Sequence, residues 1–284
     1  MIVLFDSTCL IECLRINQTE SLVKTKVKKF YDIIYNDTIE VLFSDRYIKH
    51  LEQVIPDRQI FEALIVELSD KSRLKKENTS SDVTIEQEFS SLYQKCSSPY
   101  VFPVSIGDNI VYLQSDENGF STIKSTSTKY KIIDSLLTKG TYQTSYQDFK
   151  NDNEISNFFK DVFSLPRVIN KVVIINREID VNYMISLKGK LIHYYTLKTS
   201  GSYFFDDAKE ELKKLGGKVK LHYTTNKRDI HERKIIIDGL IITTDNSFQN
   251  LTVKEPTWDI NIVYNHEKAD KWLSKCSKFK PVKQ

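Results

Sequence analysis

The segment Ile230–Gly239 constrains the fold more than any other part of the chain. It reads Ile-His-Glu-Arg-Lys-Ile-Ile-Ile-Asp-Gly, and Leu-Ile-Ile-Thr follows at once. Isoleucine is β-branched and favours strands, whereas an Asp-Gly dipeptide favours the tight turn of a β-hairpin. The sequence therefore predicts two short antiparallel strands within residues 235–243, joined by a turn at Asp238-Gly239.

The same segment places an imidazole close to a guanidinium. His231 and Arg233 are two residues apart, and a strand has a side-chain period of two. Extended backbone would point both side chains to one face, with Glu232 and Lys234 on the other. An imidazole can attack phosphorus or move a proton, and a fixed cation neutralises phosphate oxygens. The pattern predicts phosphoryl chemistry at this strand.

The order of motif, hairpin and small polar loop resembles the C-terminal half of the phospholipase D superfamily. The signature of that family is His-x-Lys-x4-Asp, followed by a Gly-Ser-x-Asn-like loop. Here the motif is His231, Arg233 and Asp238, and the loop is Thr244–Asn250. The resemblance covers residues 168–280 and implies a mixed sheet flanked by helices.

The resemblance implies a role for each motif residue. His231 would be the phosphohistidine nucleophile or the acid, Arg233 the phosphate clamp and Asp238 the orienting acid, and this mechanism needs no cofactor. The residues expected to contact the substrate are Lys234, Asn246, Ser247 and His222.

The chain also departs from the family pattern. Arg233 stands where the family has Lys, and Asp245-Asn246 stands where Gly-Ser is expected. One copy of the motif is present, whereas the active site of the superfamily uses two. A catalytic chain would therefore be a homodimer. The alternative is a module that binds a phosphate on a lipid or a nucleotide without cleaving it.

The N-terminal half alternates short apolar strands with helices, which is typical of a parallel α/β sheet. Ile2–Phe5 reads as a strand that ends at Asp6, and Ser44 follows a second strand as the N-cap of a helix. These two landmarks resemble PIN-type ribonuclease domains, in which carboxylates surround Mg²⁺ or Mn²⁺. The first half is thus predicted to be a PIN-like domain.

The PIN-like resemblance implies a set of metal ligands. Asp6, Glu52 and Asp108 are the proposed ligands, and Asp45 and Asp82 are further candidates. Mg²⁺ requires several oxygens held together, so these carboxylates would have to meet at one point. A metal-dependent ribonuclease is the second enzymatic alternative.

Composition and charge define the domain organisation and the partners. We place the domains at residues 1–150 and 151–284, with a polar linker near residues 140–153. Residues 163–284 hold 22 Lys and Arg against 14 Asp and Glu, a net charge of +8, whereas residues 1–162 hold 19 against 24, a net charge of −5. A basic C-terminal half suits an anionic ligand such as nucleic acid.

The remaining patterns exclude several classes of protein. We find no long apolar run for a membrane span and no signal peptide, and the four cysteines are unclustered, so we expect a cytoplasmic protein with reduced thiols. Walker, dinucleotide-binding, Gly-x-Ser-x-Gly and His-Glu-x-x-His motifs are absent. These absences argue against an NTPase, a dehydrogenase, an α/β-hydrolase and a zincin.

The resemblance to the phospholipase D superfamily implies a phosphodiesterase that acts on nucleic acid, that is, a nuclease. The pairing of the two halves suggests an effector in bacterial antiviral defence or a toxin, with partner proteins of such a system.

Overall fold

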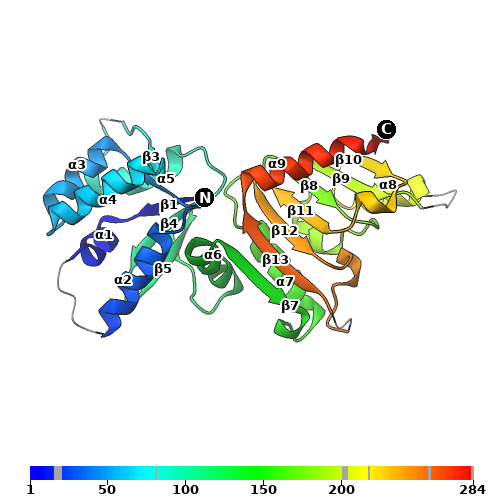
Figure 1. Cartoon of the computed structure of the whole chain (residues 1–284), viewed down its shortest axis with the longest axis horizontal. Helices are drawn as coiled ribbons and strands as arrows, with labels where there is room; N and C mark the ends of the chain where they lie inside the picture. The colour runs from blue at the N-terminus through cyan, green and yellow to red at the C-terminus, as the bar shows by residue number, and fades with distance from the viewer. Residues whose placement is uncertain (16–20, 81, 200–203, 217, 255–256, 283–284) are drawn as a thin grey trace. The chain divides into compact units, whose positions relative to one another are not determined.

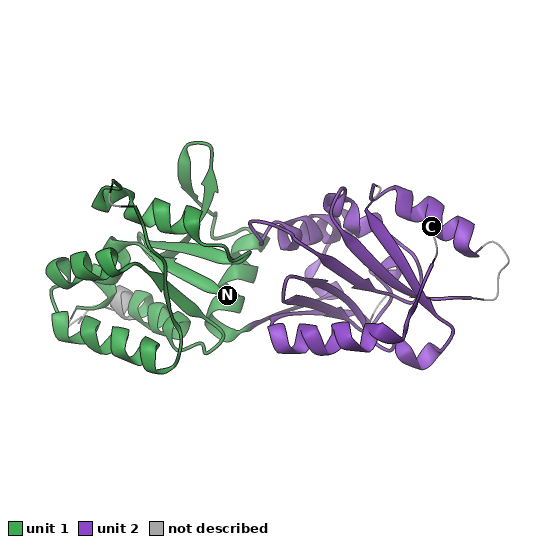
Figure 2. Ribbon diagram, turned by 90° about the horizontal axis from the view of Figure 1, so that it is seen from above, with its two compact units in different colours: residues 1–140 green, residues 141–284 purple. Residues whose placement is uncertain are grey.

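The computed structural model describes residues 1–15, 21–80, 82–199, 204–216, 218–254 and 257–282. The chain forms two compact units, Met1–Gly140 and Thr141–Gln284 (Figure 2). The division falls between Gly140 and Thr141, at the start of the segment 140–153 that was expected to be a linker. Thr141–Ser145 is not a linker, because it forms a strand that pairs with Asp259–Tyr264 in the second sheet.

Unit 1 contains a mixed sheet with the strand order β3-β2-β1-β4-β5-β6. The strands β3, β2, β1 and β4 are parallel, as the sequence predicts, but β5 and β6 are antiparallel to their neighbours. The wholly parallel sheet was a wrong expectation, because short turns join β4 to β5 and β5 to β6. The strands are β1 (Ile2–Phe5), β2 (Glu40–Phe43), β3 (Leu74–Lys76), β4 (Val101–Ile106), β5 (Ile110–Asp116) and β6 (Gly119–Thr122).

Helices lie on both faces of this sheet. In Figure 1, α1 and α2 lie on one side, and α3, α4 and α5 lie on the other. Two of these helices begin with a side-chain cap directly after a strand. Asp6 caps α1, and Ser44 caps α3, as the sequence predicts for Ser44. The helices are α1 (Ser7–Cys13), α2 (Ser21–Ile34), α3 (Asp45–Val54), α4 (Arg58–Asp70), α5 (Ile85–Lys95) and α6 (Thr128–Lys139).

Unit 2 contains a longer sheet, in which the described strands follow the order β14-β10-β9-β8-β11-β12-β13-β7. The neighbours β10, β9 and β8 are parallel, and the other pairs are antiparallel, so the sheet is mixed as predicted. The strands are β7 (Thr141–Ser145), β8 (Val172–Ile175), β9 (Ile192–Leu197), β10 (Val219–Thr224), β11 (Arg233–Ile237), β12 (Leu240–Thr244), β13 (Asp259–Tyr264) and β14 (Lys280–Pro281).

The hairpin expected within residues 235–243 is present as β11 and β12. Asp238 and Gly239 form its turn with φ angles of 44° and 97°, the positive values that this tight turn requires. Gly239 is needed for a second reason, since a Cβ there would lie 2.7 Å from Cε1 of His266. Local turn chemistry and close packing thus select the same residue.

Helices cover both faces of the second sheet. Helix α9 (His266–Lys275) packs Ala269, Trp272 and Leu273 against a cluster that includes Val173, Ile236 and Ile241. Helix α7 (Asp152–Phe163) lies on the opposite face, where Phe158 packs against Tyr142 of β7. The remaining elements are α8 (Phe204–Lys213) and the short 3-10 helices η1 (Tyr146–Asp148), η2 (Asn182–Leu187), η3 (Lys227–Asp229), η4 (Phe248–Asn250) and η5 (Cys276–Lys278).

Among the described residues, no helix combines the length and the apolar character that a membrane crossing requires.

Candidate functional site

One end of the unit 2 sheet carries a row of polar residues on the face covered by α7. The strand register places Arg233 beside Thr244, and Ile260 beside both Thr244 and Thr144. Because Lys234 pairs with Ile175, the next residue, Asn176, lies level with Arg233 on the other side. By the same reasoning Thr196 of β9 lies beside Asn176. We call the set Thr144, Asn176, Thr196, Arg233 and Thr244 the polar row.

The neighbouring row on this face is apolar. Ile174, Ile235, Ile242 and Ile262 are paired in sequence across the strands, and each is fully buried. The polar row is the next layer along the strands, and its members Thr144, Asn176, Thr196 and Thr244 are also buried. Arg233 is its partly exposed member.

Arg233 is the charged member of the row and begins β11. Its Nη1 donates to the carbonyl oxygens of Asp245, at 2.7 Å, and His231, at 3.1 Å. Its Nε is buried and has no hydrogen-bond partner among the described residues. Burial, followed by repulsion from Arg177, lowers the pKa of Arg233. The guanidinium thus retains an unused donor in a place where positive charge is disfavoured.

Asn176 and Arg177 were not anticipated from the sequence. Asn176 is fully buried, its Nδ2 donates to the Tyr194 hydroxyl at 3.4 Å, and its Oδ1 has no hydrogen-bond partner among the described residues. Arg177 Nε donates to the carbonyl oxygen of Ile230 at 3.1 Å, which fixes this second guanidinium beside the start of the His231 segment. The sequence signal that could have revealed these two residues is their position as a polar pair directly after the apolar run Val172–Ile175.

His231 lies outside the strand, which contradicts our expectation. β11 begins at Arg233, and His231 occupies a bend before it with an exposed side chain. Its carbonyl oxygen accepts from Arg233, but its imidazole makes no hydrogen bond or ion pair with another described residue. The imidazole is therefore accessible to solvent, and no neighbouring group within the described chain orients it.

Asp238 is not brought to His231. It lies in the hairpin turn, five residues beyond Arg233, which corresponds to about 16 Å of strand. Its carboxylate accepts from the backbone N–H of Asn170 at 2.8 Å and so fastens the turn to the segment before β8. The structure gives Asp238 a role in holding the hairpin, and the expected orienting contact with the imidazole is not formed.

Lys234 and His222 lie on the opposite face of the sheet from Arg233. Lys234 is buried, forms an ion pair with Glu232, and has its Nζ 4.4 Å from the centre of the Trp272 ring on α9. His222 stacks on Tyr195, with ring centres 4.4 Å apart. Strand alternation explains the position of Lys234, the residue after Arg233 in β11. The face of His222 follows from the pairing of β10 with β9, which sets His222 beside Tyr195. The expected shared cleft is not formed.

The loop after β12 contacts Arg233 through its backbone. The carbonyl oxygen of Asp245 accepts from Arg233, whereas Asn246 Oδ1 accepts from the backbone N–H of Ser247 at 2.8 Å. Ser247 is buried at the start of η4. The loop therefore contacts Arg233 through the backbone of Asp245. The Asn246 side chain bonds within the loop, and Ser247 is buried in it.

The carboxylates proposed as metal ligands in unit 1 do not form one cluster. Asp6 accepts from the backbone N–H of Cys9 at 2.7 Å and from the Ser105 hydroxyl, and burial raises its pKa. Asp108 is exposed in the turn before β5, and Glu52 lies on α3. Throughout the described ranges, no three His, Cys, Asp or Glu side chains form a group that could hold a metal ion. Asp6 acts as a helix cap here.

A pair of histidines on the α9 face predicts an acid-sensitive contribution to stability. His193 Nδ1 lies 3.3 Å from His222 Nε2. Burial, with the positive charges of Lys171, His222 and Lys220, lowers the pKa of His193 to about 4. The unfolded chain has an ordinary histidine pKa near 6.5 and so binds this proton more readily, which means that stability is lost as the pH falls from about 6.5 to 4.

His193→Phe should remove that contribution. We expect the Tm of the variant to fall less than that of the wild type between about pH 7 and pH 4.5, because the phenyl ring cannot be protonated. Thermal unfolding followed by circular dichroism measures both changes. Equal losses of Tm in the two proteins would show that His193 does not contribute to the acid sensitivity.

Comparisons with known proteins give limited similarity. No protein-family model and no curated protein matches the chain. A phospholipase D family member, Nuc from Salmonella typhimurium, is similar over 51% of this chain and 98% of its own, with a TM-score of 0.39 and 11% identity. TrmBL2, an archaeal chromatin protein, is similar over 56% of this chain and 57% of its own, with a TM-score of 0.33 and 11% identity.

Proposed function

We propose that unit 2 binds the phosphodiester backbone of a nucleic acid at the polar row. The observation that carries this proposal is the position of Arg233, whose buried Nε lacks a partner among the described residues and whose charge is disfavoured by burial and by Arg177. A phosphate between the two guanidiniums would accept from them and remove their repulsion. Such charge-assisted bonds are the strongest that a protein offers to a phosphate.

The charge of the unit favours a polyanion over an isolated phosphate. Residues 141–284 hold 24 Lys and Arg against 18 Asp and Glu, a net charge of +6. A nucleic acid engages many of these charges and gains affinity from released counterions, whereas a single phosphate engages the polar row alone. Nucleic acid is therefore the ligand class that would contact both the polar row and the other positive charges of unit 2.

Cleavage of the bound phosphodiester is a second candidate function, favoured by the free imidazole of His231 two residues before Arg233. The imidazole would attack phosphorus, a P–N bond would form, and the P–O bond to the leaving group would break. The leaving oxygen needs a proton, which His231 of a second copy in a homodimer would supply. Water would then hydrolyse the phosphohistidine and release the phosphate product.

The two candidates differ in what the site must contain. Binding requires Arg233 and Arg177, both of which are held by hydrogen bonds to backbone carbonyl oxygens. Cleavage also requires an oriented imidazole, and Asp238 does not orient it. We therefore place binding first. A metal-dependent ribonuclease in unit 1 is not part of this proposal, because Asp6, Glu52 and Asp108 do not cluster.

Arg233→Ala tests the binding proposal. We expect the affinity for labelled RNA, single-stranded DNA or double-stranded DNA to fall about ten- to a hundredfold, since a charge-assisted hydrogen bond contributes about 1.5–3 kcal/mol. The slope of affinity against salt should decrease by about one phosphate contact. Fluorescence anisotropy at several salt concentrations measures both quantities.

Arg58→Ala is the matched control, because Arg58 is a solvent-exposed arginine of unit 1 that pairs with Glu62 at 2.6 Å. Its removal should leave the affinity unchanged within error. Unchanged affinity in Arg233→Ala, with the protein folded, would exclude the polar row as the phosphate site.

A further inference from the structure

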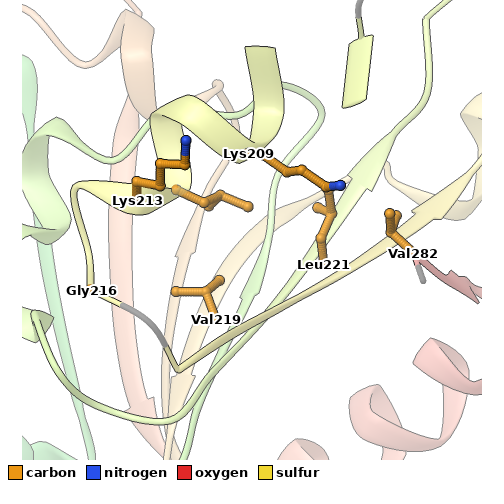
Figure 3. Close-up of a pocket in the computed structure, with 7 residues that line it drawn as sticks. Lys209, Lys213, Gly216, Val219, Leu221 and Val282 are labelled. Atoms are coloured by element: carbon orange, nitrogen blue, oxygen red, sulfur yellow. The ribbon is translucent and has the colours of Figure 1, made fainter. Parts of the chain in front are cut away.

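A cavity of about 330 Å³ lies between α8, β10 and the C-terminal segment of unit 2. Leu212 contributes to it from α8, Val219 and Leu221 from β10, and Val282 from the segment after β14. Figure 3 shows Val219, Leu221 and Val282 below the helix that carries the lysines. Protein interiors are close-packed, and mostly apolar pockets of about 300–1,000 Å³ typically take small molecules.

Two lysines complete the lining of this cavity. Lys209 and Lys213 are one helical turn apart on α8, and in Figure 3 both side chains extend beside the apolar lining. Both are exposed, and neither forms an ion pair with another described residue. By contrast, Lys214 on the next position pairs with Glu211 at 2.5 Å. Like charges at this spacing repel one another, and an anion between them would relieve that repulsion.

We propose that this cavity binds a single-chain amphiphilic anion, with its carboxylate between Lys209 and Lys213 and its alkyl chain against Val219, Leu221 and Val282. The apolar lining requires a hydrocarbon body, and the two cations select a negatively charged head group. At roughly 30 Å³ for each heavy atom, the cavity holds on the order of ten such atoms. A decanoate-sized ligand matches both the volume and the charge.

The site is independent of the proposed nucleic-acid function. Of its seven lining residues none belongs to the polar row. A failure to bind nucleic acid would therefore not contradict the proposed ligand of the cavity. A failure to bind that ligand would likewise not contradict the nucleic-acid proposal.

Decanoate, decanol and decylamine test the proposal by isothermal titration calorimetry with the full chain. The three share one alkyl chain and differ in the charge of the head group. We expect decanoate to bind at least about tenfold more tightly than decylamine, with decanol between them. In Lys209→Gln/Lys213→Gln, decanoate affinity should fall about tenfold, whereas decanol affinity should stay the same.

Two further variants distinguish the contribution of the apolar cavity to binding from the contribution of the positive charge. Lys214→Gln/Lys218→Gln removes the same number of positive charges outside the cavity lining and should leave decanoate binding unchanged. Val219→Phe fills the cavity and should weaken decanoate and decanol together, and circular dichroism verifies that each variant is folded. Wild-type protein that binds no decanoate, or a double variant at Lys209 and Lys213 that binds it as tightly as wild type, would overturn the proposal.

Discussion

If the wild-type protein cleaves nucleic acid, as the second candidate function requires, His231→Ala is expected to lower the cleavage rate by about a thousandfold or more and to leave nucleic-acid affinity within about twofold. A nucleophile acts in the transition state, so its removal affects turnover far more than ground-state binding. His231 also has an exposed side chain, so the substitution should leave the fold intact. Single-turnover assays with labelled RNA and DNA, with and without EDTA, measure the rate.

His50→Ala is the control, since it removes a histidine of α3 in unit 1. The wild-type protein should also sediment as a dimer if it cleaves, because one His231 supplies half of the acid–base pair. A monomer that cleaves at the full rate would contradict the two-histidine mechanism. A wild-type protein that binds nucleic acid through Arg233 and cleaves none would be a phosphate reader, the non-catalytic alternative.

Phe159→Ala is expected to destabilise unit 2 by about 3–5 kcal/mol, the usual cost of removing a fully buried phenyl ring. Phe159 of α7 is completely buried. Its ring stacks on Tyr183 at 5.2 Å and meets Phe248 edge-on at 6.2 Å. These contacts join α7, η2 and η4 over the face of the sheet that carries the polar row. Urea unfolding followed by circular dichroism measures the change in the free energy of unfolding.

Tyr35→Ala provides the comparison for this substitution. Tyr35 is also aromatic, but it is 57% exposed, so its truncation should cost less than about 1 kcal/mol. A small loss in Phe159→Ala would mean that the aromatic contacts of α7 are not the main source of stability on this face. Nucleic-acid binding should weaken in proportion to the unfolded fraction, because an unfolded sheet has no polar row.

Several features of the candidate site could be predicted from the sequence because they depend on neighbours along the chain. The turn at Asp238-Gly239 follows from two residues that accept positive φ angles, and the strands beside it follow from their isoleucines. The alternation of side chains correctly separates Arg233 from Lys234. The expectation for His231 was wrong because the period of two applies within a strand, and β11 begins only at Arg233.

The composition of the polar row could not be predicted, because it depends on strand register. Thr244 reaches Arg233 through the hairpin of β11 and β12. The other members, Thr144, Asn176 and Thr196, join the row only through the pairing of strands that are not consecutive in the chain. Apart from the Asp238-Gly239 turn, which pairs β11 with β12, the sequence contains no local signal for which strand lies beside which. For the same reason His222 was placed in the wrong cleft, since its face depends on the pairing of β10 with β9.

The sequence by itself determined the local elements: the hairpin, the cap formed by Ser44, and the positive charge of the second half. Each follows from backbone preferences or from composition, which act over a few residues. The tertiary structure decided which side chains meet. It brought Arg233 level with Asn176 and near Arg177, and it kept Asp6, Glu52 and Asp108 from forming a cluster. These outcomes depend on long-range packing, in which the burial of one apolar face fixes the register of every strand in the sheet.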